Sequence, residues 1–99
     1  MRRGSTPELR FELPFAGSEV EKLSVAFEQR GKVVLEKTLA DCEVQGCEVS
    51  VQLSEDDTLA FLPDEPVARV QVRCGMGDRR MASDILSVPV RQILRGGKL

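Results

Sequence analysis

Carboxylates form the densest group of reactive side chains in this sequence. Glu55, Asp56 and Asp57 are consecutive, and Asp64 and Glu65 follow shortly after. Carboxylate oxygens are ligands that calcium prefers, and two carboxylates with different pKa values can act as acid and base in a hydrolase. The spacing matches no calcium-binding loop, however, and adjacent carboxylates on the first turn of a helix splay apart. We therefore interpret these residues as a helix cap and a solvated loop.

The residue types that most enzymatic sites need are missing. There is no histidine, tyrosine or tryptophan, and the absence of histidine excludes every Ser–His or Cys–His pair. Gly75-Met76-Gly77 has the glycine spacing that begins a phosphate-binding loop, but the third glycine and the following helix are lacking. We interpret it as a turn, and we expect neither enzymatic activity nor a cofactor.

Three cysteines, Cys42, Cys47 and Cys74, make an odd number and a poor disulfide framework. If Gln45 and Gly46 form a two-residue hairpin turn, Cys42 and Cys47 are diagonal neighbours about 7–8 Å apart, which is too far for a comfortable disulfide. All three thiols fall on apolar faces of the expected strands, where cysteine behaves as a small hydrophobic residue. We predict unpaired, inert thiols.

Charge is unevenly distributed along the chain, although the formal net charge is only -2. Eight acidic and no basic side chains lie between Lys37 and Arg69, whereas seven basic and two acidic side chains lie from Val67 onward. The two regions either neutralise each other within the fold or join an acidic patch to a basic patch on a second copy, and the sequence leaves both alternatives open. The candidate contact residues are seven basic side chains: Arg2, Arg3, Arg79, Arg80, Arg91, Arg95 and Lys98.

Nucleic acids and membranes are not expected partners. Single-strand nucleic-acid sites use exposed aromatic side chains, and all four phenylalanines occupy positions typical of a core: Phe11, Phe15, Phe27 and Phe61. No apolar run approaches the roughly 18 residues of a membrane span. Residues 1–6 contain two arginines but no apolar segment follows them, which is unlike a signal peptide, so we expect synthesis in the cytoplasm.

Apolar and polar side chains alternate along most of the chain, which is typical of β-strands with one buried face. A three-residue turn at residues 29–31 keeps the apolar faces of its two strands in phase, with Val25 opposite Leu35. A two-residue turn at residues 45–46 does the same for the next pair and places Cys42 opposite Val49. We therefore predict two hairpins with these registers.

Three local signals mark the edges and ends of strands. The apolar phase changes after Ile85, which predicts a bulge or a strand that switches sheets. Pro89 cannot donate to a strand ladder and favours an edge position there. Ser54 and Asp57 have the spacing of a capping box, which predicts one short helical turn near residues 55–60.

Together these features predict an all-β fold, a single immunoglobulin-like β-sandwich of about seven strands that spans residues 1–99. The length suits one domain with one core, and 41% apolar with 30% charged residues is typical of globular proteins. Residues 1–6 and 95–99 lack apolar periodicity, and we expect them to be flexible tails.

Several segments resemble a family of small phage and prophage proteins from Gram-positive bacteria. They are RRGSTP at residues 2–7, LPF at 13–15, VLEKT at 34–38, LSEDDTL at 53–59 and ILRGG at 93–97. The resemblance spans nearly the whole chain, and its motifs are strand edges, a helix cap and turns. Members of the family look like products of tail-region gene clusters, and their β-sandwich character is similar to that of the amino-terminal domains of phage baseplate proteins. The family supplies no catalytic residues.

The resemblance implies a non-enzymatic structural or assembly protein of a phage tail or baseplate, whose partners are other tail proteins or further copies of itself. Such a protein is made in the host cytoplasm and, in this role, is carried in the virion tail. Its contacts would use exposed strand edges or basic terminal segments that become ordered on binding. The alternative is a stand-alone protein-binding module, such as a host-factor inhibitor or a receptor-binding domain.

Overall fold

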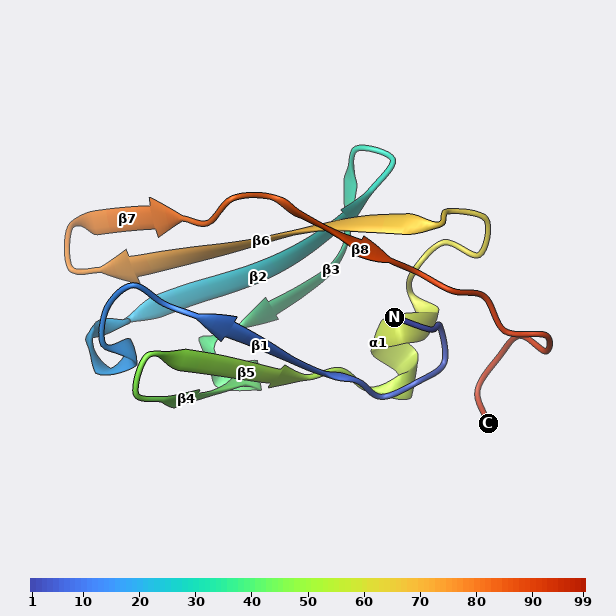
Figure 1. Ribbon diagram of the computed structural model, residues 1–99, viewed down its shortest axis with the longest axis horizontal. Helices are drawn as coiled ribbons and strands as arrows, with labels where there is room; N and C mark the ends of the chain where they lie inside the picture. Colours follow the sequence, from blue (N-terminus) through green and yellow to red (C-terminus); the bar gives the residue numbers. More distant parts are fainter.

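The computed structural model describes residues 1–99 as two antiparallel β-sheets packed face to face, which confirms the predicted all-β sandwich (Figure 1). One sheet has three strands in the order β1 (Glu8–Glu12), β5 (Glu48–Gln52) and β4 (Cys42–Gln45). The other has five strands: β3 (Lys32–Thr38), β2 (Lys22–Gln29) and β6 (Val67–Met76) in that order, with β7 (Arg79–Ala82) and β8 (Leu86–Pro89) both paired to β6.

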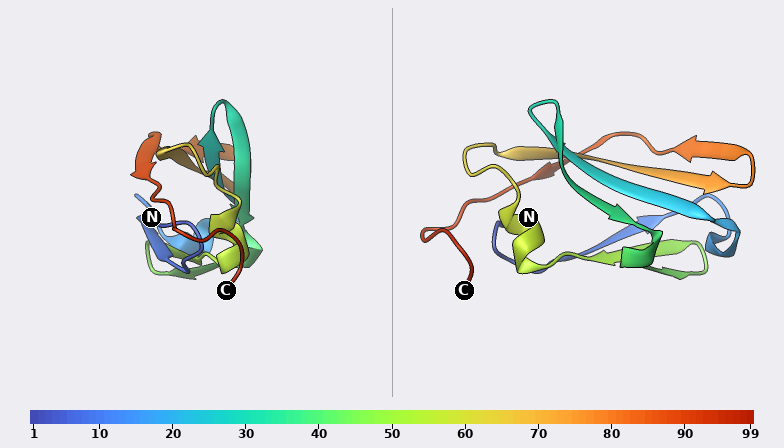
Figure 2. Two further views of the ribbon diagram at one scale, coloured as in Figure 1. Left: turned by 90° about the vertical axis from the view of Figure 1, so that its right-hand side faces the viewer. Right: turned by 180° about the vertical axis from the view of Figure 1, so that it is seen from behind.

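The chain crosses between the sheets three times, and each crossing contains one short helix (Figure 2). These helices are η1 (Gly17–Glu19) between β1 and β2, η2 (Leu39–Asp41) between β3 and β4, and α1 (Glu55–Leu59) between β5 and β6. Gly17 tolerates no side chain, because a Cβ there would overlap the Val44 side chain and lie 2.9 Å from the Gly46 carbonyl oxygen. The first crossing is therefore packed tightly against the β4–β5 hairpin.

The core lies between the sheets and consists of the inward-facing side chains of both. Phe27 and Phe61 are almost completely buried, and their rings meet edge to face with centroids 5.7 Å apart. Val25 of β2 and Val49 and Val51 of β5 are fully buried around them. Burial of each such side chain contributes about 1.5–3 kcal/mol, so the alternating pattern of the strands is what holds the two sheets together.

Helix α1 begins as the sequence predicts. Ser54 Oγ accepts a hydrogen bond from Asp57 N at 3.1 Å, and Asp57 Oδ2 accepts one from Ser54 N at 2.8 Å. Asp57 Oδ2 also lies 2.8 Å from Lys37 Nζ of β3, and these two side chains are only 16% and 17% exposed. The capping box therefore also ties the helix to the five-stranded sheet.

The turn between β2 and β3 has two residues, and the prediction of three was wrong. Arg30 and Gly31 both have left-handed φ angles, 54° and 78°, as the tight type I′ hairpin turn requires. The extra residue lies instead in β3, where Val34 bulges between the residues that pair with Glu28 and Phe27. The bulge restores the apolar phase that a two-residue turn alone would break.

The predicted pairing of Val25 with Leu35 is therefore wrong by two residues, because Val25 pairs with Lys37. A shift of two leaves every side chain on its own face of the sheet, so alternation alone cannot detect it. In the observed register Lys37 lies opposite Val25 on the inner face of the sheet, and Asp57 neutralises it.

The β4–β5 hairpin differs from its prediction in the same way. It turns at Gly46 and Cys47 and places Val51, rather than Val49, opposite Cys42. Cys47 therefore leaves the apolar face and is exposed, which corrects the prediction that all three thiols lie on apolar faces. Cys42 is half-buried and Cys74 is buried, and all three cysteines are unpaired.

The change of apolar phase after Ile85 is a bulge, and the strand does not switch sheets. β7 and β8 both pair with β6, but their registers differ by one residue. Between them Ser83 N donates to Val72 O at 2.8 Å, and Val72 N donates to Ser83 Oγ at 3.0 Å. This break divides the last of the seven expected strands and accounts for the eight observed.

Residues 1–6, expected to be a flexible tail, are instead hydrogen-bonded to the domain. Arg91 N donates to Met1 O at 2.6 Å, and Arg3 N donates to Arg91 O at 2.9 Å. The Arg3 guanidinium donates to the carbonyl oxygens of Phe61 and Leu59 at 2.7 and 3.2 Å, which satisfies carbonyls at the end of α1. These are backbone contacts that apolar periodicity does not reveal.

Residues 95–99 have fewer contacts, and for them flexibility stays a prediction. Lys98 Nζ lies 3.2 Å from Asp56 Oδ2, and both side chains are exposed. Leu99 is also fully exposed.

Candidate functional site

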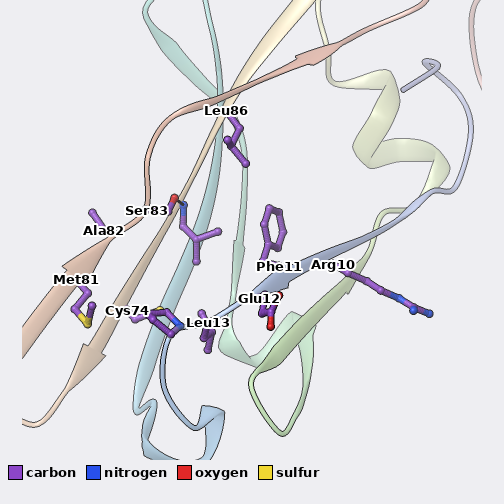
Figure 3. A pocket seen from close by; sticks show the side chains of 11 residues that line it. Arg10, Phe11, Glu12, Leu13, Cys74, Met81, Ala82, Ser83 and Leu86 are labelled. Carbon is purple, nitrogen blue, oxygen red and sulfur yellow. Dashed lines mark hydrogen bonds between the residues drawn. The ribbon is translucent and has the colours of Figure 1, made fainter.

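At one long side of the sandwich, which we call the joined side, the short helix η2 links the two sheets, and the other long side is open. On the joined side the chain passes from β3 through η2 directly into β4. On the open side the edge strand β1 faces β7 and β8, and a groove of about 300 Å³ separates them (Figure 3). We call it the β1–β7 groove; its lining residues are Arg10, Phe11, Glu12, Leu13, Pro14, Val72, Cys74, Met81, Ala82, Ser83 and Leu86.

The walls of the groove are mostly apolar. Met81 and Leu86 pair with Cys74 and Val70 of β6, so their side chains point to the inner face of the five-stranded sheet. They are nevertheless 39% and 52% exposed, because no strand covers them on the open side. Phe11 of β1 is half-buried on the opposite wall. The groove is thus a part of the sandwich interior that stays accessible to solvent.

The edge of β1 adds backbone hydrogen-bonding groups to the groove. Leu13 N donates to Cys47 O at 2.6 Å and Leu53 N donates to Pro7 O at 2.9 Å, so the odd-numbered residues of this segment bond to the β5 side. In an antiparallel pair the residues between them turn their N–H and C=O groups the other way. The backbone groups of the even residues 8, 10 and 12 therefore point to the open edge, where β1 has no partner strand.

The outer rim of β1 is charged. Arg10 Nε lies 2.7 Å from Glu8 Oε1 and 3.9 Å from Glu48 Oε1, and its side chain points away from the groove (Figure 3). The hydrogen bond that Arg10 donates to Glu8, with the charges of Glu8 and Glu48, raises the pKa of Arg10 above its usual value. Glu12, the next outward residue, has no ion pair. The rim therefore carries one neutralised arginine and an excess of carboxylates.

This arrangement suits binding more than chemistry. The groove brings together apolar side chains and unpaired backbone groups, and its one thiol, Cys74, is buried and has a pKa that burial raises. Across residues 1–99, no group of three or more cysteine or carboxylate side chains is placed to hold a metal ion. A polypeptide in extended conformation presents the matching pattern of backbone groups and side chains.

The basic side chains predicted as contact residues are not in the groove and do not form one surface. Arg79 and Arg80 lie at the β6–β7 turn, at the far end of the molecule from α1 (Figure 1). Five others lie at the α1 end, near both termini: Arg2, Arg3, Arg91, Arg95 and Lys98. Arg3 is already bonded to the carbonyls of α1, so it has a structural role.

The acidic residues are likewise divided between two places. Glu55 and Asp57 belong to the first turn of α1. Asp64 and Glu65 hold Arg30 of the β2–β3 turn, with N–O distances of 2.8 and 3.2 Å. The hydrogen bond from Arg30 lowers the pKa of Asp64. These carboxylates therefore connect a loop to a hairpin.

We expect one of the three thiols to react much faster than the others with a thiol reagent such as DTNB under native conditions. Cys47 is exposed in its turn, whereas burial raises the pKa values of Cys42 and Cys74, and a raised pKa lowers the fraction of reactive thiolate. Cys47→Ser should remove the fast phase. A fast phase that survives in this variant would contradict the assignment.

The exposed residues of the groove, Met81 and Leu86, were missed as functional residues by sequence reasoning. The phase change after Ile85 was the available signal, since a bulge beside an edge often marks a site where pairing ends. Without the position of β1, however, it did not indicate an opening between the sheets.

No helix of the structure has the length and apolar character to cross a membrane. Comparisons of the chain with family models, with curated proteins and with solved structures found no match.

Proposed function

We propose that this chain is a non-enzymatic protein-binding module that acts through the β1–β7 groove, as a structural or assembly component of a phage or prophage tail or baseplate. The observation that carries the binding function is the open side of the sandwich, where Met81 and Leu86 face inward and yet stay exposed. Exposed apolar surface of this kind, next to unpaired strand edges, is typical of interaction sites.

The two long sides of the sandwich differ in how the chain closes them. On the joined side η2 links β3 directly to β4, whereas on the open side Leu86 keeps about half of its surface in solvent. Covering an apolar side chain contributes about 25 cal/mol for each Å² removed from water. A partner that covers these side chains would therefore gain binding free energy from apolar burial, in addition to that of any backbone hydrogen bonds.

The tail or baseplate setting rests on the sequence resemblance described above. The partners expected in that setting are other tail proteins or further copies of this chain. The basic residues at the two ends of the molecule would serve as additional contacts in an assembly, with Arg79 and Arg80 at one end and Arg91 and Arg95 at the other.

Site-specific photo-crosslinking during particle production tests this proposal. A photoreactive amino acid at Leu86 should give crosslinks to tail or baseplate proteins, whereas the same residue at Glu43, exposed on β4 at the joined side, should give few. Crosslinks from Leu86 to a host protein would favour the inhibitor or receptor-binding alternative. Equal yields from the two positions would contradict a binding function of the groove.

A further inference from the structure

We infer that β1 binds an extended segment of a partner protein as an additional strand, and that the inward side chains of this segment fill the β1–β7 groove. The inference rests on the proposed function, because it specifies how the groove binds a protein. The segment has apolar side chains at alternate positions, with basic side chains at two of the positions between them.

The open edge of β1 provides the hydrogen bonds for such a strand. The N–H and C=O groups of Glu8, Arg10 and Glu12 form an uninterrupted row that points away from β5. Neighbouring strands lie about 4.8 Å apart, so an added strand would lie in the gap between β1 and the β7–β8 edge. Main-chain bonds then supply affinity, and the side chains that enter the groove supply specificity.

The apolar positions of the segment follow from the geometry of pairing. Residues directly opposite each other on neighbouring strands point to the same face, so the residues opposite Leu9 and Phe11 point into the groove. There they would meet Phe11 on one wall and the exposed parts of Met81 and Leu86 on the other. Aliphatic side chains fit this environment, because most of the lining residues are hydrophobic and the Ser83 hydroxyl is already bonded to Val72 N and Asp84 O.

The charged positions follow from the outer rim. The residues opposite Glu8, Arg10 and Glu12 point outward, and opposite charges across a strand pair stabilise the pairing. Basic side chains therefore suit the two positions opposite Glu8 and Glu12, and an acidic or neutral one suits the position opposite Arg10. Glu12, which has no ion pair within the chain, gains the most from a basic neighbour.

The same pattern disfavours a second copy of β1 as the added strand. Antiparallel pairing of two β1 strands over their full length places Arg10 opposite Arg10 and Glu8 opposite Glu12, so every outward pair has like charges. A shift by two residues relieves this repulsion, but it brings Thr6 or Pro14, which lie outside the strand, into the ladder. The partner segment is therefore expected to come from a different sequence.

Synthetic peptides test strand addition without changing the fold of the protein. The probe is the acetylated and amidated peptide VKVEVKV, which places lysines opposite Glu8 and Glu12 and glutamate opposite Arg10 in either strand direction. Its affinity is measured by titration at concentrations where the peptide alone is monomeric. In an antiparallel strand, N-methylation of the central Glu removes an N–H that bonds to β1 and should weaken binding about tenfold. N-methylation of the adjacent Val, whose N–H points away from β1 in an antiparallel strand, should then change the affinity little, and a parallel strand would reverse the two effects.

Charge and location have their own controls. The charge-reversed peptide VEVKVEV should bind about tenfold more weakly than the probe. Leu86→Ser should weaken binding of the probe, whereas Val33→Ser should not, since Val33 is 59% exposed but lies outside the groove. No binding of VKVEVKV would overturn the inference, and so would equal losses for the two N-methylated peptides. Either result leaves the proposed function to be decided by crosslinking at Leu86, so the two failures are distinguishable.

Discussion

Replacing Phe61 with alanine is expected to lower the free energy of unfolding by about 4 kcal/mol, the range typical of a large aromatic side chain removed from a core. Phe61 is 1% exposed, and its ring meets that of Phe27 edge to face. Such aromatic pairs contribute about 0.5–1.5 kcal/mol beyond the burial of their area. The variant therefore loses burial, a ring contact and the packing of α1 on the core at once.

Urea unfolding followed by circular dichroism measures this loss as a shift in the transition midpoint. Small domains have a total free energy of unfolding of about 5–15 kcal/mol. Phe61→Ala would therefore retain only a small part of its stability if the parent protein lies at the low end of this range. Phe15→Ala is the matched control, because Phe15 lies in the segment after β1 and is only half-buried. This change should lower the free energy of unfolding by about 1–2 kcal/mol. Equal losses in the two variants would contradict the central position of Phe61.

Replacing Asp57 with alanine is expected to lower the free energy of unfolding by about 3 kcal/mol. The change removes the acceptor of Ser54 N from the capping box, which is worth about 1 kcal/mol, and it leaves Lys37 largely buried without its counter-charge. An unpaired buried charge is strongly destabilising. Asp56→Ala is the control, because the ion pair of Asp56 with Lys98 is exposed on both sides and such pairs contribute at most about 1 kcal/mol.

The same carboxylate should make stability depend on pH. Burial works to raise the pKa of Asp57, but hydrogen bonds from Lys37 and Ser54 outweigh it and hold the pKa below the usual 3.8. Because the folded-state pKa is the lower one, the stabilisation is complete above the unfolded-state value and is lost as the pH falls through the folded-state value. Acid unfolding of Asp57→Asn should therefore be less steep as the pH falls below about 4. An acid unfolding profile that is the same for Asp57→Asn would contradict a lowered pKa of Asp57 in the folded state.

Alternation in the sequence was sufficient to predict the fold class and which face most strand residues occupy. Val25, Phe27, Val49 and Val51 are all buried as predicted. It was not sufficient for the register, because a shift of two residues preserves every face. A tertiary contact, such as the ion pair of Lys37 with Asp57 of α1, carries the missing information, and this contact depends on the position of α1.

Polar residues that bond to distant backbone were the other source of error. Gln29 was assigned to a turn, yet it is 2% exposed, accepts a hydrogen bond from Leu62 N at 2.7 Å and donates one to Val67 O at 3.3 Å. Arg3 satisfies carbonyls at the end of α1 in the same way. Neither residue carries a sequence signal for its partner, since the partner becomes adjacent only when the chain has folded.

The sequence predicted the type of contact surface, an exposed strand edge, but not its location in the fold. Exposed strand edges were expected to make the contacts, and Pro89 correctly indicated an edge at β8. The groove itself requires that β1 and the β7–β8 edge lie on the same side of the sandwich, which short-range patterns do not specify. The basic residues, by contrast, were chosen for their charge and are divided between the two ends of the molecule.

The position of β1 also has a consequence for synthesis on the ribosome. β1 pairs only with β5, so its residues emerge long before their partner strand and wait without one while the β2–β3 hairpin and β4 are made. A nascent segment of alternating apolar residues is prone to aggregate during that interval. Charges between the apolar residues reduce this tendency, and Glu8, Arg10 and Glu12 occupy those positions. We therefore expect Glu8, Arg10 and Glu12 to reduce aggregation of the nascent chain, in addition to forming the charged rim of β1 in the folded protein.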